Sequence, residues 1–405
     1  MIDAEWRSLQ SIDQSHNRMS TKLTLIKSAD DNSHIPESRL LVANIVLMLC
    51  NLAIASGSAV GQGQSQQVQK IAFFVCGDPQ YLAERSGNPT KLDPLSEEAN
   101  AGFIERLLKL PGSRLPDSMG GGNVAEQIWG LINTGDLIDS LDKNGGPYPA
   151  MQEFEWKRFL ADYGLNGKDG KIPIPVYEVH GNHDGPQGDT FIIDAIIDRN
   201  QSRREIVNVS ENGLHYSWNW GSVHLVNLGI FVGEGEKKRE GHHYAPRSSL
   251  DFLRSDLAKH VGESGRPVIL THHLHLDAPE FDWPAEDLAG YYQTIKRFNV
   301  IAIFNGHTHG SPPKLRRWNG EEIGSNLNGF DNFDPDDAGA SKLHNGKPVG
   351  LSHGLLYVEI VDQPGVLKDS MTVRSYVTRD NWHTAKWDRL WRKMIQAPDR
   401  IPQNP

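Results

Sequence analysis

Short and nearly continuous apolar runs constrain the fold of this 405-residue chain more than any other sequence feature. The runs are rich in β-branched and aromatic residues, which predicts strands, and they lack polar alternation, which predicts that both faces of each strand are buried. We expect such strands at residues 71–76, 128–134, 174–179, 223–229, 267–271 and 300–305.

Amphipathic segments lie between these strands. Residues 95–110 place Ala99, Phe103 and Leu107 four residues apart on one helical face, and residues 248–261 show a similar periodicity after a capping serine. Strand–helix alternation of this kind predicts an α/β layered domain. Later in the chain, two apolar runs follow each other without a helix between them, which indicates a second sheet or an antiparallel edge. These runs are 355–361 and 371–377.

The N-terminal region differs in character from the rest of the chain. Residues 40–55 are mostly apolar and end in an Ala-x-Ala pattern, as in a secretory signal, and they are shorter than the roughly 20 residues of a membrane-spanning helix. We expect export or membrane anchoring through this segment; the alternative is a buried helix of a cytoplasmic protein. The expected organisation is a leader with a flexible spacer at 1–66, a folded domain at 67–379 and a C-terminal tail at 380–405.

Charge and cysteine content exclude several classes of function. The chain has 41 Lys and Arg against 51 Asp and Glu, a net charge of −10 that repels a phosphate backbone, so general nucleic-acid binding is not expected. The two cysteines, Cys50 and Cys76, cannot form a disulfide framework.

Polar side chains follow five of the predicted strands directly. In parallel α/β sheets the carboxyl ends of strands meet at one edge, so these side chains are expected to converge. Carboxylate, amide and imidazole groups are donors that divalent or trivalent metals accept, and the sequence therefore predicts a metal site. The residues concerned are Asp78, Gln80, Asp136, Asp139, Asn182, His183, Asp184, His272, His273, His307 and His309.

The ordered motifs Asp-x-Gln, Gly-Asp-x-x-Asp, Gly-Asn-His-Asp, a strand-terminal His and Gly-His-x-His resemble those of the calcineurin-like metallophosphoesterase superfamily. The resemblance spans roughly residues 70 to 365 and is specific to a subfamily with Gln in the first motif. It implies an α/β fold, a four-layer αββα sandwich of two mixed sheets flanked by helices, with a dinuclear metal site at the sheet edges.

The same resemblance implies a ligand set. The first metal would bind Asp78, Gln80, Asp136 and His309, and the second would bind Asp136, Asn182, His272 and His307. His272 is preferred because it comes first after the strand, but one residue of register would select His273. Superfamily members commonly have His where this chain has Gln80. An amide oxygen is a weaker and harder donor than imidazole, so the first site favours manganese, iron or magnesium over zinc; alternatively, Gln80 makes only a structural hydrogen bond.

The expected function is hydrolysis of a phosphomonoester or phosphodiester. The resemblance implies in-line attack by a hydroxide that bridges the two metals, with His183 protonating the leaving group and Asp139 and Asp184 in supporting positions. Two alternatives remain: a nuclease on the same scaffold, and a non-catalytic metal-binding scaffold for protein assembly. The substrate is expected to be a small molecule or an acidic head group.

A basic segment at residues 237–247 contains His242 and His243 beside several Lys and Arg residues. It is predicted to lie on a loop between a strand and a helix, where it could hold a phosphate or an acidic head group. The alternative is an ordinary solvated loop.

Overall fold

The computed structural model describes residues 69–84, 87–309, 312–339, 343–344, 347–348, 351–362 and 370–395. The expected leader, including the apolar segment at 40–55, lies outside the described residues. Within the described ranges, no helix is both long enough and apolar enough to cross a membrane. The described residues belong to one compact unit that spans Ser65–Pro405.

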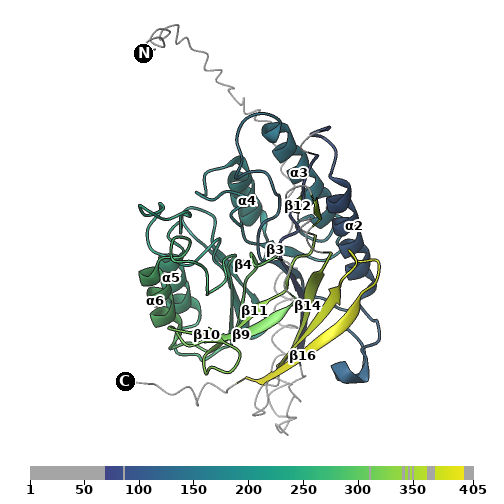
Figure 1. The fold of residues 1–405 in the computed structure, drawn as a ribbon. Coiled ribbons are helices and arrows are strands. Elements are labelled where there is room, and N and C mark those ends of the chain that lie inside the picture. Colours follow the sequence, from purple (N-terminus) through teal and green to yellow (C-terminus); the bar gives the residue numbers. More distant parts are fainter. Residues whose placement is uncertain are drawn as a thin grey trace, which may run out of the picture. The chain divides into compact units, whose positions relative to one another are not determined.

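Two mixed β-sheets form the centre of this unit (Figure 1). In the first sheet, β1 pairs in parallel with β2, and β2 with β3, whereas β14, β15 and β16 add antiparallel strands on the other side. Its order is β16 (Lys386–Met394), β15 (Ser370–Thr378), β14 (His353–Asp362), β1 (Gln69–Cys76), β2 (Leu131–Asn133) and β3 (Val176–Glu178).

The second sheet has a parallel centre of β6, β7, β8 and β11 with antiparallel edges. Its order is β10 (Ile323–Gly324), β9 (Lys314–Trp318), β11 (Phe330–Asp334), β8 (Val300–Phe304), β7 (Val268–Thr271), β6 (Val223–Asn227), β5 (Tyr216–Trp220) and β4 (Ile206–Val209). Two short strands, β12 (Leu343–His344) and β13 (Lys347–Pro348), pair only with each other.

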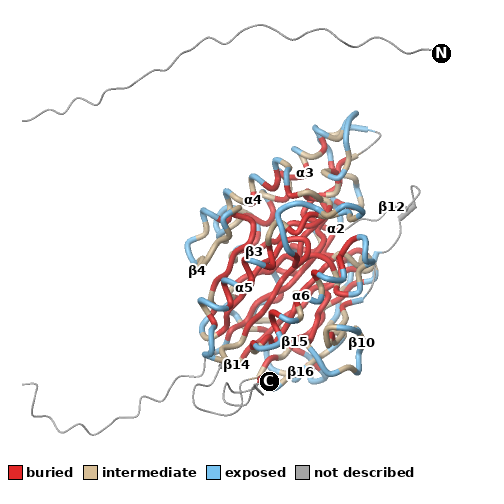
Figure 2. The backbone as a smooth tube through the Cα atoms, turned by 90° about the vertical axis from the view of Figure 1, so that its left-hand side faces the viewer, coloured by how far each residue is buried: buried red, intermediate tan, exposed pale blue. Residues whose placement is uncertain are grey.

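Helices cover the outer face of each sheet. The first sheet is covered by α2 (Pro94–Lys109), α3 (Tyr148–Tyr163) and α4 (Phe191–Ser202), and the second by α5 (Ser249–His260) and α6 (Ala285–Ile295). A 3-10 turn, η2 (Asp117–Met119), lies in the loop after α2. The tube view shows buried strands between helices whose outer faces are exposed (Figure 2).

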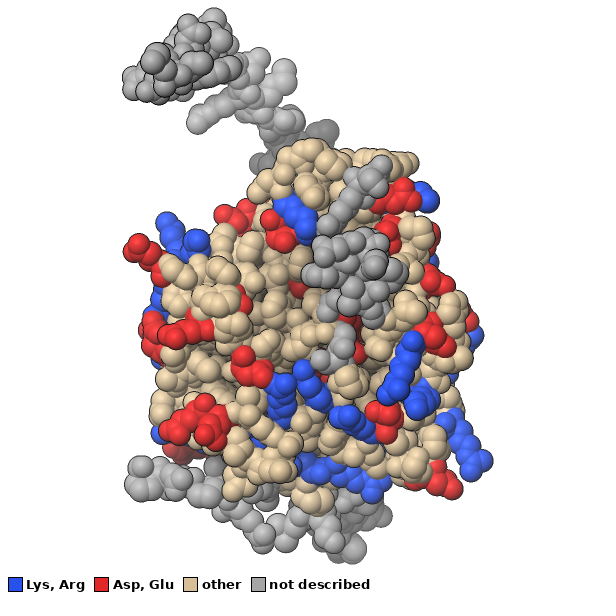
Figure 3. Space-filling model, viewed as in Figure 1, with Lys and Arg blue, Asp and Glu red and all other residues tan. Residues whose placement is uncertain are grey.

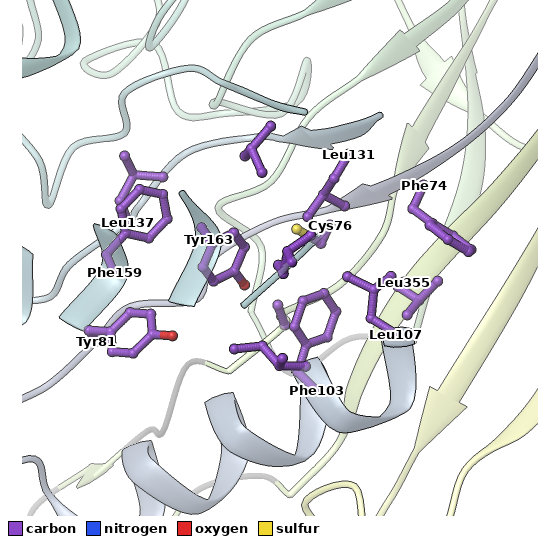
Figure 4. Packing of buried hydrophobic residues seen from close by; sticks show 14 of the residues in the cluster. Phe74, Cys76, Tyr81, Phe103, Leu107, Leu131, Leu137, Phe159, Tyr163 and Leu355 are labelled. Carbon is purple, nitrogen blue, oxygen red and sulfur yellow. The ribbon is translucent and has the colours of Figure 1, made fainter. Parts of the chain in front are cut away.

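Alternate residues of each central strand enter different cores, as strand geometry requires. In β1, Phe73 and Val75 pack between the sheets against Trp220 and Phe304, whereas Phe74 faces the helices. On that helix side, aromatic residues of α2 and α3 belong to the same core as Phe74 of β1 and Leu355 of β14 (Figure 4). Each fully buried large apolar side chain contributes about 1.5–3 kcal/mol, so these layers dominate the stability of the fold.

The residues at the N-terminus of α2 explain where this helix begins. Asp93 caps the helix by accepting hydrogen bonds from the backbone N–H groups of Leu95 (3.0 Å) and Ser96 (3.4 Å). Pro94 occupies the first turn, where its missing N–H has no cost. The face predicted from residues 95–110 is the one buried in the core.

The predicted fold class is confirmed, since the two mixed sheets lie between two helical layers. Every predicted strand is present, and the two late apolar runs are β14 and β15 of the first sheet. The segment expected as a tail contributes β16, which extends that sheet beyond residue 379.

Candidate metal centre

The loops that leave β1, β2 and β8 have an unusual backbone. Five predicted ligands have positive φ angles: Asp78 (46°), Gln80 (34°), Asp136 (53°), His307 (71°) and His309 (28°). Left-handed backbone costs roughly 1–2 kcal/mol for each non-glycine residue, so the surrounding contacts must hold these turns. Strained residues of this kind cluster at functional sites, and five of the ten non-glycine residues with positive φ in the described ranges are predicted ligands.

Two glycines allow the loops to approach each other. A Cβ added to Gly181 would lie 2.1 Å from Asp136 Oδ1, and one added to Gly306 would lie 2.6 Å from Asp78 Oδ2. Both distances are shorter than non-bonded carbon–oxygen contacts in real structures. The glycines in the Gly-Asn-His-Asp and Gly-His-x-His motifs are therefore required for close packing against neighbouring ligands.

A first donor group consists of Asp78, Asp136 and His309, whose potential ligand atoms all lie within 4.8 Å of one another. Gln80 adjoins this group, because its Nε2 donates to Asp136 Oδ2 at 3.4 Å. These are the four residues predicted for the first metal. The structure also shows the structural hydrogen bond that we considered as the alternative role of Gln80.

A second donor group consists of Asp136, His273 and His307, within the same 4.8 Å limit. The Nε2 of His273 lies 3.2 Å from Asp136 Oδ2, 3.2 Å from His307 Nδ1 and 3.1 Å from Asn182 Oδ1. Three donor atoms thus lie within 3.2 Å of His273 Nε2, and one of them is a nitrogen that faces it. A cation satisfies such a set of lone pairs, so the residues fit the metal that the motifs imply.

His272, which we preferred as a ligand, lies outside both groups. Its Nδ1 is 2.7 Å from the carbonyl oxygen of Leu274, and its ring packs edge-on against Trp283 and Tyr291. The structure instead places His273, the alternative one residue further along the strand, in the second group. Side chains alternate along β7, and position 272 points to the helices while position 273 points to the first sheet.

Burial and neighbouring charges move the pKa values of Asp78 and Asp136 in opposite directions. Burial raises the pKa of Asp78 to about 8. Burial also disfavours ionisation of Asp136, but His273 and His183 outweigh it and hold its pKa far below the usual range. Asp136 is therefore the carboxylate that remains anionic between the two groups.

His183 lies beside the second group, where its backbone N–H donates to Asp136 Oδ1 at 2.9 Å. Its Nδ1 is 2.9 Å from the backbone carbonyl oxygen of Asp139 and 3.4 Å from Asp142 Oδ1. Burial opposes its charged form, but Asp136, Asp142 and Asp139 raise the pKa of His183 to about 10.

Asp184 and Asp139, the residues predicted to support the site, act through hydrogen bonds that involve backbone groups. The carboxylate of Asp184 accepts hydrogen bonds from the N–H groups of Leu137, Ile138 and Gly181 at 2.8–3.1 Å. It thereby ties the loop after β3 to the loop after β2, and these loops carry Asn182 and Asp136. Asp139 orients His183 through its carbonyl oxygen.

Sequence reasoning missed two acidic residues at this site. Asp142 faces His183, and its position three residues after Asp139 on the same loop was the available signal. Asp337 contacts His309, but it lies far beyond the last motif, and no sequence pattern connected the two.

The histidines predicted to bind substrate lie on the loop between β6 and α5. His243 is 58% exposed, with its Nδ1 2.9 Å from Asp282 Oδ1, and its ring packs on exposed Phe281. His242 Nδ1 is 3.0 Å from the carbonyl oxygen of Glu280. Neither belongs to the donor groups.

Several solved structures match this chain at low identity. They include the calcineurin-like phosphoesterase YfkN from Bacillus subtilis, which is 11% identical with a TM-score of 0.35 and matches over 82% of this chain and 92% of that one. A phosphatase from Mycoplasma pneumoniae is 11% identical (TM-score 0.31; 84% and 98% covered). Vps29 from Chaetomium thermophilum is 12% identical (TM-score 0.29; 80% and 99% covered). No curated protein matches the sequence.

Family membership rests on the sequence instead. The family model described as calcineurin-like phosphoesterase matches residues 71–311, which is more than half of the chain. The matched span contains every predicted ligand from Asp78 to His309 and both donor groups. Members of this family typically bind two metal ions. The chain belongs to the calcineurin-like phosphoesterase family.

Proposed function

We propose that the protein is a dinuclear metal-dependent hydrolase of phosphomonoesters or phosphodiesters. The observation that carries the proposal is that Asp136 belongs to both donor groups, so one buried carboxylate would bridge two cations. Two adjacent cations would lower the pKa of a water molecule toward about 7 and neutralise charge on a phosphoryl group.

The residues around this centre would have distinct roles. The first cation would be held by Asp78, Gln80, Asp136 and His309, and the second by Asp136, Asn182, His273 and His307. His183 is fixed through Nδ1 by the loop carbonyl of Asp139, which leaves Nε2 for the substrate. From that position His183 would donate a proton to the departing oxygen, a step that contributes about 10²- to 10⁴-fold.

Substitutions of Asp136 and His183 separate metal binding from the chemical step. We expect Asp136→Asn to lose bound metal and activity together, and His183→Ala to keep its metal content while turnover of p-nitrophenyl phosphate or its bis-ester falls about 10²- to 10⁴-fold. His383→Ala is a matched control, because His383 is 67% exposed and lies outside the motifs. An Asp136→Asn protein that retains full activity would refute the shared-ligand assignment.

The same assays distinguish the alternatives. The purified protein is supplied with manganese, zinc or iron and then treated with a chelator, and both nitrophenyl esters and a DNA duplex are offered. Cleavage of the esters that stops with chelator supports the proposal. Cleavage of DNA alone indicates a nuclease, and metal binding without hydrolysis of any substrate indicates a scaffold.

Charge pairing supports a small phosphoester over a nucleic acid. Lys and Arg side chains gather on the lower part of the face in Figure 3, where Figure 1 places β9 and β16. Arg317 of β9 and Lys393 of β16 both pair with Asp331 at 3.0 Å, and Arg316 pairs with Asp277. Cations that are already paired attract a polyanion weakly.

We retain His242 and His243 as proposed contacts for an acidic group of the substrate. Their loop has less free positive charge than the sequence suggested, because Arg239 pairs with Glu286 and Asp287, and Arg247 pairs with Glu236. His243 is the more exposed of the proposed pair, and a higher KM for His243→Ala would support its role.

A further inference from the structure

Asp337 reaches the first donor group from outside the region that the family model matches. It follows β11, and its Oδ1 lies 2.8 Å from Nδ1 of His309. The contact is buried, with side-chain exposures of 3% for Asp337 and 15% for His309. The family match ends at residue 311, so this carboxylate lies beyond it.

The contact determines which nitrogen of His309 is available. A carboxylate facing Nδ1 favours the tautomer that carries its proton there, which leaves the lone pair on Nε2. That nitrogen lies 3.8 Å from Asp78 Oδ1, on the side of the first donor group. A neighbouring carboxylate also makes the imidazole a stronger donor, as in the carboxylate–histidine pairs of other metal sites.

In the second group, the Nδ1 atom of the corresponding histidine faces a weaker hydrogen-bond acceptor. His273 turns its Nδ1 to the backbone carbonyl oxygen of Thr134 at 2.8 Å, a neutral group. A neutral amide adjoins each group, Gln80 the first and Asn182 the second, but of His309 and His273 only His309 faces a carboxylate at Nδ1.

The backbone of residue 337 makes structural hydrogen bonds of its own. Its carbonyl oxygen accepts from Gly354 N–H at 2.9 Å, and its backbone forms a parallel bridge with Gly77. Substitution of the side chain leaves these links in place. We propose that Asp337 is a positioning residue that fixes the His309 tautomer and strengthens cation binding at the first site.

The inference rests on the proposed metal centre and is tested by binding rather than activity. Cobalt(II) is titrated into the metal-free protein and followed by absorption and calorimetry. We expect two sites in the wild type and, in Asp337→Asn, a 10- to 100-fold weaker first site with the second unchanged. Asp331→Asn is the control, since Asp331 is a buried acid of β11 whose partners are Arg317 and Lys393, outside both donor groups.

Each outcome has a separate meaning. Two sites of unchanged affinity in Asp337→Asn overturn the inference alone, and an equal loss in Asp331→Asn shows a general charge effect and also overturns it. A wild type that binds no cation refutes the proposed function itself.

A measurement on the wild type covers the case in which the variant does not fold. Nitrogen-15 spectra of histidine-labelled zinc protein, assigned with His309→Gln, are expected to show a protonated Nδ1 and a zinc-bound Nε2 at His309. The opposite tautomer would contradict the assignment.

Discussion

Glycine 181 shows how closely the chain approaches itself at the centre of the site. A methyl group at this position would overlap Asp136. We expect Gly181→Ala to displace one of the two loops, to lower metal content and to reduce stability by at least about 2 kcal/mol, as overpacking does. The measurements are metal analysis and thermal unfolding.

Gly324→Ala is the matched control for this prediction. A Cβ at Gly324 would meet Leu327 at an ordinary 3.6 Å, so the variant should behave as the wild type. A Gly181→Ala protein with full metal content would show that the loops can move apart at little cost.

His272 and His273 provide a second test at the scale of single residues. We expect His273→Gln to bind one cation fewer and His272→Gln to keep both, because the His272 ring faces Trp283 and Tyr291 instead of the donor groups. The metal-to-protein ratio of each folded variant is the measurement. Loss of metal only in His272→Gln would contradict the register seen here.

The preference for His272 over His273 has a physical cause. Residues 267–270 are apolar, because β7 is buried on both faces, so no polar alternation shows which side chains face the helices and which face the first sheet. The identity of the loops that hold ligands could be predicted, because strand ends in an α/β sheet share an edge. Asp337 could not, because its contact with His309 depends on the pairing of β11 with β8.

At the scale of elements, an ion-pair cluster fixes α4 to β3. Glu178 of β3 is fully buried, accepts a hydrogen bond from Arg199 Nε at 2.8 Å and forms an ion pair with Arg203 Nη2 at 2.6 Å. Burial disfavours its charge, but the two guanidinium groups lower the pKa of Glu178 to about 2 from an ordinary 4.5. A lowered pKa in the folded state stabilises the protein above pH 4.5, and this contribution is lost as pH falls toward 2.

We therefore expect Glu178→Gln to be less stable than the wild type at pH 7 by roughly 3–5 kcal/mol, since it leaves buried arginines without a charged partner. The difference should shrink as pH falls from about 4.5 to about 2. Denaturant unfolding of both proteins across this range is the measurement. A difference that does not vary with pH would show that the carboxylate charge is not the stabilising feature.

Strand order shows what could be predicted for whole elements. The central strands were identifiable from composition, but β4, β9, β10, β11 and β16 were not, because their residues are mixed in polarity. The last strand alternates charged residues with Trp387, Leu390 and Trp391. Its place became clear only from its pairing with β15, which no local pattern specifies.

At the scale of the whole molecule, the donor groups join the two sheets. Asp78 and Asp136 follow strands of the first sheet, whereas His273, His307 and His309 follow strands of the second. Bound cations would therefore link the sheets in the folded state only, and binding to the folded state raises stability.

A chelator should accordingly lower the thermal midpoint of the loaded protein. At a free metal concentration of 100 times Kd, binding contributes about 2.7 kcal/mol, which corresponds to roughly 5 °C. Readdition of manganese should restore the midpoint, and Asp136→Asn should show no response to either treatment. Differential scanning calorimetry checks this, and an unchanged midpoint would argue against cations that connect the sheets.

The left-handed backbone at the ligand positions lowers stability, whereas the side chains at the same positions are needed for the proposed activity. Glycine in place of Gln80 or His309 would release roughly 1–2 kcal/mol of conformational energy and at the same time delete a donor. Selection of random variants for heat resistance in the presence of a chelator, where bound cations add no stability, should therefore enrich substitutions that inactivate the protein, and the positions enriched would map the site without any assay of its chemistry.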